Sequence, residues 1–360
     1  MADGADRISL YGLDPAGLAD AVRAAGAPAF RARQIGEWLY ARPVASWEEM
    51  SNLPKALRAA LAERFLDLDG TLETLEAAGE PGGTRKILSR LADGELVETV
   101  VIPARDRATV CVSSQVGCAM GCAFCASGRN GCARNLSAGE IAAQAARAAV
   151  LLGRRPDNVV FMGMGEPFAN YDNALAAARR MNAPAPDGFG IGARRITFST
   201  CGVVPGIERF AREGVQFELS VSLHAPTDAL RDALMPVNRR WPLGVLVPAV
   251  RAYTEKTGRI VTFEYTLVAG FNDGPEHAKA LLALVRGFPC RVNLIPLNPV
   301  PGFDGRAPAP ADCEAFRAFL DRRGLNATLR RSKGRGVNAS CGQLRRARIG
   351  AAGSAAGDAR

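Results

Sequence analysis

The sequence predicts an α/β fold, an open and partial (βα)6 barrel with a small helical domain before it and a short tail after it. The first observation is that strand-like and helix-like segments alternate from Ala108 onward. The second is that the strand-like segments are rich in Val, Ile and Phe, which is typical of a parallel sheet buried on both faces. The third is that six such repeats fit a partial barrel better than eight-fold closure.

The first 70 residues are expected to form a helical domain. Apolar residues recur there every three to four positions, in Gly17–Ala25, Arg31–Ala41 and Leu53–Phe65. Cations and aromatics are interleaved around Phe30–Gln34 and Trp38–Tyr40. Two interpretations stay open. The aromatics fill the core of a small bundle, or the domain (1–70) docks RNA through phosphate contacts and base stacking.

Residues 71–107 are expected to form a β-hairpin linker region. Asp93-Gly94 is a strong turn signal, and Val97–Pro103 is strand-like. That strand carries Glu98 among apolar neighbours. Its carboxylate either faces solvent or is buried with a raised pKa that would suit proton transfer.

The barrel is expected to span residues 108–325. Its six strands are predicted at Ala108–Ser113, Asn158–Met162, Arg195–Thr200, Phe217–Leu223, Ile260–Val268 and Arg291–Leu297. Its helices are predicted at Ser137–Leu152, Asn173–Met181, Leu243–Lys256, Glu276–Val285 and Ala311–Arg323. Ser137 and Glu140 form a capping box that opens the first helix. Ligands of such sheets bind at the carboxyl ends of the strands.

The C-terminal residues divide into two segments. Residues 326–348 include a possible edge strand at Thr328–Arg331, a Gly-rich stretch, Cys341 and several arginines. Residues 349–360 are rich in Ala and Gly, which predicts a disordered tail.

Composition narrows the classes of function. The chain of 360 residues has a formal net charge of +9, which favours a polyanionic partner. We see no apolar run of membrane-spanning length and no signal peptide, so we expect a cytoplasmic protein without a membrane partner. Nine cysteines would be unusual as disulfides in a reducing cytosol, which favours metal and catalytic roles. Cys132, Cys201, Cys290 and Cys313 are interpreted as small core or loop residues.

The most informative motif is Cys118-x3-Cys122-x2-Cys125, three cysteines in a loop of small residues just past the first barrel strand. A 4Fe–4S cluster normally takes four cysteines, so three leave one iron open for chemistry. The alternatives are a zinc site and a chance clustering of buried cysteines. The chain has only two histidines, neither nearby, which disfavours zinc.

Polar groups follow several of the other strands. Gly163-Met-Gly165-Glu166 ends the second strand, and its two glycines would allow a ligand close to the backbone. The further candidates for cofactor binding are Ser199, Ser222, Leu223, His224 and Asn298. They lie at the ends of the third, fourth and sixth strands, where they would contact one cofactor.

The cysteine motif resembles the signature of the radical S-adenosylmethionine (SAM) superfamily, and the Gly165-Glu166 loop resembles its SAM-binding loop. The whole set resembles the RlmN/Cfr-type RNA adenosine methyltransferases. The matching segments are Phe30–Gln34, Gly83–Lys86, Val97–Pro103, Cys111–Cys118, the cluster loop, Arg134–Leu136, Phe161–Pro167, Ser222–Ala225, Met235–Asn238, Asn293–Gly302 and Ala339–Leu344.

This resemblance implies a mechanism and its cofactors, a 4Fe–4S cluster on Cys118, Cys122 and Cys125 together with SAM. A first SAM would methylate Cys341, and a second would yield a 5′-deoxyadenosyl radical that takes hydrogen from that methyl. The carbon would then add to adenine, and Cys111 would release the product by forming a transient disulfide with Cys341. Glu98 stands at the position of the family's proton-transferring glutamate.

The resemblance also implies the substrate: C2 of an adenosine in 23S rRNA, with tRNA as a second candidate substrate. We expect a flavodoxin or ferredoxin as electron donor, and a monomer. Gly336, Ser340 and the loop Ser127–Cys132 depart from the family pattern. The alternatives are a C8-methylating Cfr-type enzyme, a radical SAM enzyme with a non-RNA substrate, and a zinc-stabilised RNA-binding protein.

Overall fold

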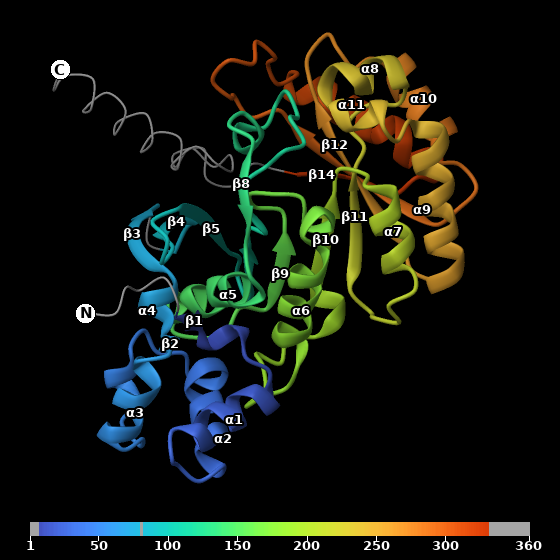
Figure 1. Cartoon of the computed structure of the whole chain (residues 1–360). Coiled ribbons are helices and arrows are strands. Elements are labelled where there is room, and N and C mark those ends of the chain that lie inside the picture. The colour runs from blue at the N-terminus through green and yellow to red at the C-terminus, as the bar shows by residue number, and fades with distance from the viewer. Residues whose placement is uncertain (1–6, 80–81, 331–360) are drawn as a thin grey trace, which may run out of the picture.

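The structure is a computed structural model that describes residues 7–79 and 82–330 (Figure 1). Its centre is one ten-stranded sheet in the order β14-β13-β12-β11-β10-β9-β6-β5-β4-β3. The strands from β6 to β14 are parallel neighbours, and those from β3 to β6 are antiparallel neighbours. The α/β partial barrel is therefore confirmed.

All six predicted barrel strands are present, shifted by a residue or two. They are β6 (Ala108–Cys111), β9 (Asn158–Phe161), β10 (Ile196–Thr200), β11 (Glu218–Ser222), β12 (Val261–Leu267) and β13 (Cys290–Pro296). The edge strand expected near Thr328 is β14 (Ala327–Leu329), which pairs with β13. The rest of the C-terminal segment, with Cys341, Gly336 and Ser340, lies outside the described residues.

The five predicted barrel helices are also present. They are α5 (Ala138–Leu152), α6 (Tyr171–Asn182), α9 (Leu243–Thr257), α10 (Pro275–Leu284) and α11 (Pro310–Asp321). Ser137 caps α5 as expected, because its hydroxyl accepts from the Glu140 N–H while the Glu140 carboxylate accepts from the Ser137 N–H. Two short helices, α7 (Val204–Phe210) and α8 (Asp228–Leu234), were not anticipated, since seven residues give too few turns for a clear periodicity.

The N-terminal domain is helical. It contains α1 (Pro15–Ala24), α2 (Phe30–Gly36), a single π-helical turn (Glu37–Ala41), α3 (Lys55–Ala62) and α4 (Leu68–Thr71), and the short strands β1 (Ile8–Ser9) and β2 (Phe65–Leu66) pair beside them. Its aromatics divide between the core and the surface, and RNA docking by this domain stays a prediction. Tyr40 is buried in the core, whereas Phe30 is 57% exposed with the Arg31 guanidinium over its ring.

The hairpin region continues the barrel sheet. β4 (Arg85–Arg90) and β5 (Leu96–Pro103) flank the Asp93-Gly94 turn, and β3 (Glu73–Ala78) forms the sheet edge. Glu98 does not face solvent. It is buried at 2% exposure, with the Lys86 Nζ 3.4 Å from its carboxylate.

The two faces of the barrel sheet differ in chemistry. The outward face is apolar and buried, with Phe198, Leu219 and Phe263 on neighbouring strands. The inward face is polar, and Ser220 lies between Ser199 and Thr262 in register. The inner side of the sheet does not pack on helices, because it lines a cavity of about 600 Å³.

No helix in residues 7–79 and 82–330 combines the length and the apolar character that crossing a bilayer requires.

Candidate active site at the carboxyl ends of the strands

The three cysteines lie on a loop between two short strands that were not anticipated. β7 (Gln115–Gly117) and β8 (Cys132–Asn135) pair antiparallel, and the loop forms the tip of this hairpin. Gly117 has φ +83°, and a Cβ there would lie 2.1 Å from the Gly131 carbonyl oxygen, so only glycine fits. The Ala123 N–H donates to the Leu234 carbonyl at 2.9 Å, which fastens the loop to the end of α8.

The three thiols influence one another electrostatically. Burial raises the pKa of Cys118 to about 12, and the charge of Cys125 adds to this effect. Burial also raises the pKa of Cys122, with added contributions from Cys125 and Cys118. Three thiolates this close are unfavourable unless a cationic centre neutralises them, so the donor set fits an iron–sulfur cluster.

A second observation supports that fit. The Ser127 hydroxyl, two residues after Cys125, is buried and has no hydrogen-bond partner among the described residues. Within the same residues, no three His, Cys, Asp or Glu side chains converge as they would on a single metal ion. A four-iron cluster binds each cysteine at a different iron, so its ligands need not meet at one point.

The Gly163–Glu166 loop is bound tightly to the segment before the cysteines. The Ser114 N–H donates to the Met164 carbonyl at 2.8 Å, and the Glu166 N–H donates to the Gln115 side chain at 2.9 Å. A Cβ on Gly163 would lie 2.7 Å from the Ser113 Oγ, and one on Gly165 would lie 2.6 Å from the Gln115 Cβ. The glycines thus bring two protein loops together, and the room for a ligand that the sequence pattern suggests stays a prediction.

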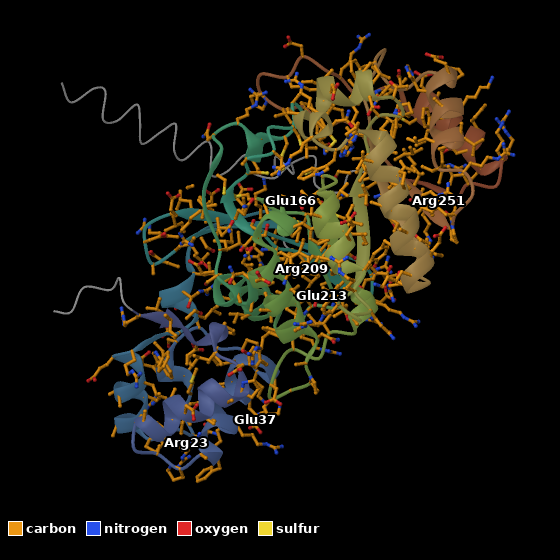
Figure 2. The ribbon with its side chains drawn as sticks, turned by 45° about the vertical axis from the view of Figure 1, so that its right-hand side comes forward. Arg23, Glu37, Glu166, Arg209, Glu213 and Arg251 are labelled. Carbon is orange, nitrogen blue, oxygen red and sulfur yellow. The ribbon has the colours of Figure 1, made fainter. Side chains whose placement is uncertain are left out.

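Glu166 is buried inside the barrel (Figure 2). Its carboxylate accepts from the Cys201 N–H at 2.7 Å and from the Phe168 N–H at 3.0 Å, while burial raises its pKa. Cys201, interpreted from sequence as a small core residue, is buried but also lies within electrostatic range of Cys122 and Cys118. Glu166 therefore fixes the end of β10 beside the cysteine loop.

Arg231 of α8 is the largest fully buried side chain of the described residues. Its guanidinium donates to the carbonyls of Cys201 (2.7 Å), Leu223 (3.1 Å) and Ser222 (3.2 Å), and to the Asn238 side-chain oxygen (2.8 Å). It thereby joins the ends of β10 and β11. Arg231 is not among the site residues predicted from sequence. The signal that could have indicated its burial is its position one turn before Leu234, on the same face of the helix.

His224 has a strained backbone, with φ +57° in the left-handed region. The Asn272 amide holds its carbonyl at 2.7 Å, and the Thr266 N–H donates to its Nδ1 at 2.9 Å. Burial, and then the charge of Arg231, lower the pKa of His224 to about 3. The imidazole is therefore neutral, with its proton on Nε2 and its ring edge-on to Phe124 of the cysteine loop.

The remaining candidates differ in what they can offer a ligand. Ser199 and Ser222 lie on the half-exposed inner face, and Asn298 follows the end of β13. Leu223 is buried in the core, its N–H donates to the Glu264 carbonyl, and its own carbonyl accepts from Arg231. Leu223 thus stabilises the strand end and has only its carbonyl lone pair left to bind anything else.

Glu98 and Cys111 lie on the inner face of two neighbouring strands. Val100 of β5 pairs with Cys111 of β6, and Glu98 is two residues before Val100 on the same side. The Ser113 hydroxyl donates to the Glu98 carbonyl at 2.6 Å. Cys341 lies outside the described residues, so its distance to Cys111 is not part of this geometry.

Glu264 is a buried acid on the inner face of β12, and we expect its negative charge to lower the stability of the fold at neutral pH. Burial raises its pKa, although the Asn293 amide, which donates at 2.7 Å, partly opposes the shift. An acid whose pKa is raised by folding destabilises the fold as pH rises above its unfolded value of about 4.3. Glu264→Gln should therefore raise the thermal midpoint at pH 7–8 and not near pH 4. Glu276→Gln, at a 71% exposed side chain, is the control, and equal midpoints for Glu264→Gln and wild type at pH 8 would contradict the expectation.

Comparison with known proteins supports the geometry. Residues 112–282 match the protein family described as "Radical SAM superfamily". Residues 8–66 match the family described as "Ribosomal RNA large subunit methyltransferase N-terminal domain". The chain is 51% identical to "Probable dual-specificity RNA methyltransferase RlmN" of Moorella thermoacetica, across 94% of this chain and 97% of that protein. It is 47% identical to "Dual-specificity RNA methyltransferase RlmN" of Anaeromyxobacter dehalogenans, with coverages of 94% and 92%.

A solved structure agrees. It is described as a radical SAM methyltransferase from Sphaerobacter thermophilus, and it matches with a TM-score of 0.88 at 47% identity, over 93% of this chain and 98% of that one.

Proposed function

This chain belongs to the RlmN family of radical SAM RNA methyltransferases, and from that premise we propose that it methylates C2 of adenosine in 23S rRNA and in tRNA. The N-terminal match and the dual specificity in its relatives' names support the two RNA classes. The observation that carries the proposal is that Cys111 and Glu98 lie on the same inner face of neighbouring strands.

We assign the cofactor sites as follows. Cys118, Cys122 and Cys125 would each hold one iron of a 4Fe–4S cluster, and the open fourth iron would hold SAM. Residues around that position would line the SAM site: Gly165, Glu166, Ser199, Ser222, Leu223, His224 and Asn298. Glu166 and Leu223 would act through the backbone they hold in place. When bound, the cluster and SAM supply a carbon radical able to remove a hydrogen atom.

We assign the methyl transfer to three residues. The Cys341 thiolate would accept a methyl group from one SAM, and that methyl group would then give up one hydrogen atom, for which a second SAM would be needed. This route suits C2, an electrophilic carbon that ordinary SAM methylation cannot reach. After the methylene carbon has bonded to C2, the adduct would lose its unpaired electron to a one-electron acceptor and its C2 hydrogen as a proton to Glu98. The Cys111 thiolate would then attack the Cys341 sulfur, and the carbon–sulfur bond would break. The carbon keeps the electron pair and takes a proton, and a dithiol reductant must reopen the resulting disulfide.

We assign proton transfer to Glu98 because it is buried beside Cys111's strand, with Lys86 to balance its charge. A flavodoxin or ferredoxin as electron donor, a monomeric state and a cytoplasmic location stay predictions.

The test is nucleoside mass spectrometry. Unmodified rRNA and tRNA incubated with the reconstituted protein, SAM and a reductant should acquire 2-methyladenosine. Appearance of 8-methyladenosine would favour the C8 alternative, and absence of either nucleoside in both RNAs would reject the proposal.

A further inference from the structure

A cleft of about 360 Å³ lies where the helical domain meets the barrel, away from the active site. The helical domain contributes one wall, and the barrel loop with Ala185 and Pro186 contributes the other. The lining residues of the helical domain are Arg33, Glu37, Trp38, Ala41, Arg42 and Asn52. Figure 2 shows Glu37 on the helical domain and Glu166 inside the barrel, in separate parts of the molecule.

The walls of the cleft are fixed in place. The Trp38 indole N–H donates to the Asn52 side-chain oxygen at 2.6 Å, which sets the plane of the ring. The Arg31 guanidinium donates to the Asn52 carbonyl at 3.0 Å. A Cβ on Gly36 would lie 2.4 Å from the Pro186 carbonyl oxygen, so the two domains touch directly beside the cleft. The cleft therefore exists before any ligand arrives.

The backbone of this wall is also irregular. Glu37–Ala41 forms a π-helical turn, closed by the Arg42 N–H donating to the Glu37 carbonyl at 2.9 Å. Single π-turns inside helices occur frequently at functional sites. Here the turn carries three of the lining residues, Glu37, Trp38 and Ala41, along one wall of the cleft.

The chemistry of the lining fits a nucleotide. An indole and a proline offer flat apolar surfaces for a base, and Arg33 and Arg42 offer guanidinium groups for phosphate oxygens. Glu37, 3.6 Å from Arg33, offers a carboxylate that can accept from a base amino group. The volume is within the range of small-ligand sites.

We propose that this cleft binds an unpaired nucleotide of the RNA substrate, with its base on Trp38 and its phosphate on Arg42 and Arg33. The inference rests on the proposed function. Figure 1 shows α2 and α8 at opposite ends of the molecule, and α8 holds the cysteine loop. The nucleotide in the cleft is therefore not the adenosine that is methylated. It belongs to a distant part of a folded RNA that reaches both ends of the protein.

The test uses the full-length, cluster-loaded protein and an unmodified RNA that the wild type methylates, with binding measured by fluorescence anisotropy. Ala41→Glu fills the cleft with a negative side chain and removes no wall contact. Trp38→Leu removes the stacking surface. Each should weaken binding by about 10-fold. Arg42→Ala should lower the slope of log K against log salt by about 1.

Arg23→Ala is the matched control, because it removes one exposed guanidinium from the same domain, on α1 and outside the cleft (Figure 2). The Arg23→Ala variant should bind RNA far more tightly than the Ala41→Glu variant does. SAM cleavage in the absence of RNA should be equal in all variants, which shows that the active site is intact. If Trp38→Leu lowers the thermal midpoint of the protein, its weaker RNA binding can come from a loss of stability. The RNA affinity of Ala41→Glu then decides whether the cleft binds RNA.

If Ala41→Glu binds RNA with wild-type affinity and Arg42→Ala shows the wild-type salt slope, the proposal that the cleft binds a nucleotide is wrong. The proposed function would still stand. A wild-type protein that neither binds nor methylates RNA would overturn the proposed function, and the cleft with it.

Discussion

Cys111→Ala should leave the protein covalently joined to its RNA. In the proposed sequence, the Cys111 sulfur breaks the bond between the Cys341 sulfur and the carbon on the base. Without that attack the carbon–sulfur bond persists, so the first turnover stops at a protein–RNA adduct and multiple turnover is abolished. Denaturing electrophoresis with labelled RNA would show a band of the combined mass that depends on SAM and reductant.

Two controls make this result specific. Cys313→Ala, at a buried thiol of α11 that has no role in the scheme, should methylate and release RNA normally. The double variant Cys111→Ala/Cys341→Ala should form no adduct, because no sulfur carries the methyl group. Release of methylated RNA by Cys111→Ala at the wild-type rate would contradict the assignment of Cys111.

Arg231→Met should destabilise the protein more than any other change at this site. The guanidinium is fully buried and holds three strand-end carbonyls and the Asn238 amide oxygen. Its removal leaves four buried neutral acceptors without a donor, and each unsatisfied buried acceptor typically costs about 1–3 kcal/mol, so the free energy of unfolding should fall by several kcal/mol. Chemical denaturation of the protein would measure the loss.

Two further variants test the geometric explanation. Arg231→Lys keeps the charge but cannot reach all four acceptors, so its stability should fall between those of wild type and Arg231→Met. Arg209→Met removes an exposed arginine that pairs with Asp172, and stability should hardly change (Figure 2). If Arg231→Met unfolds at the same denaturant concentration as wild type, the strand ends do not depend on this guanidinium.

Much of the fold was predictable because its signals are local. The barrel strands are runs of apolar residues such as Val159 and Phe161, and Ser137 with Glu140 marks a helix start within four residues. The family was predictable as well, since the cysteine spacing and the segments around it are linear motifs, and the RlmN relatives confirm it.

Other features could not be predicted, because they depend on residues far apart in the chain. Lys86 reaches Glu98 only because β4 and β5 pair in one register. Gly163 and Gly165 meet Ser113 and Gln115 across two different loops. Their glycine pattern alone equally suggested room for a ligand.

Local signals specify which elements form and which chemistry the cysteines can support, because periodicity, capping and motif spacing act over a few residues. Which groups come into contact depends on how distant segments pack. A buried arginine joined strand ends 21 residues apart, from Cys201 to Ser222. These contacts arise from packing between distant segments, and no local pattern encodes them.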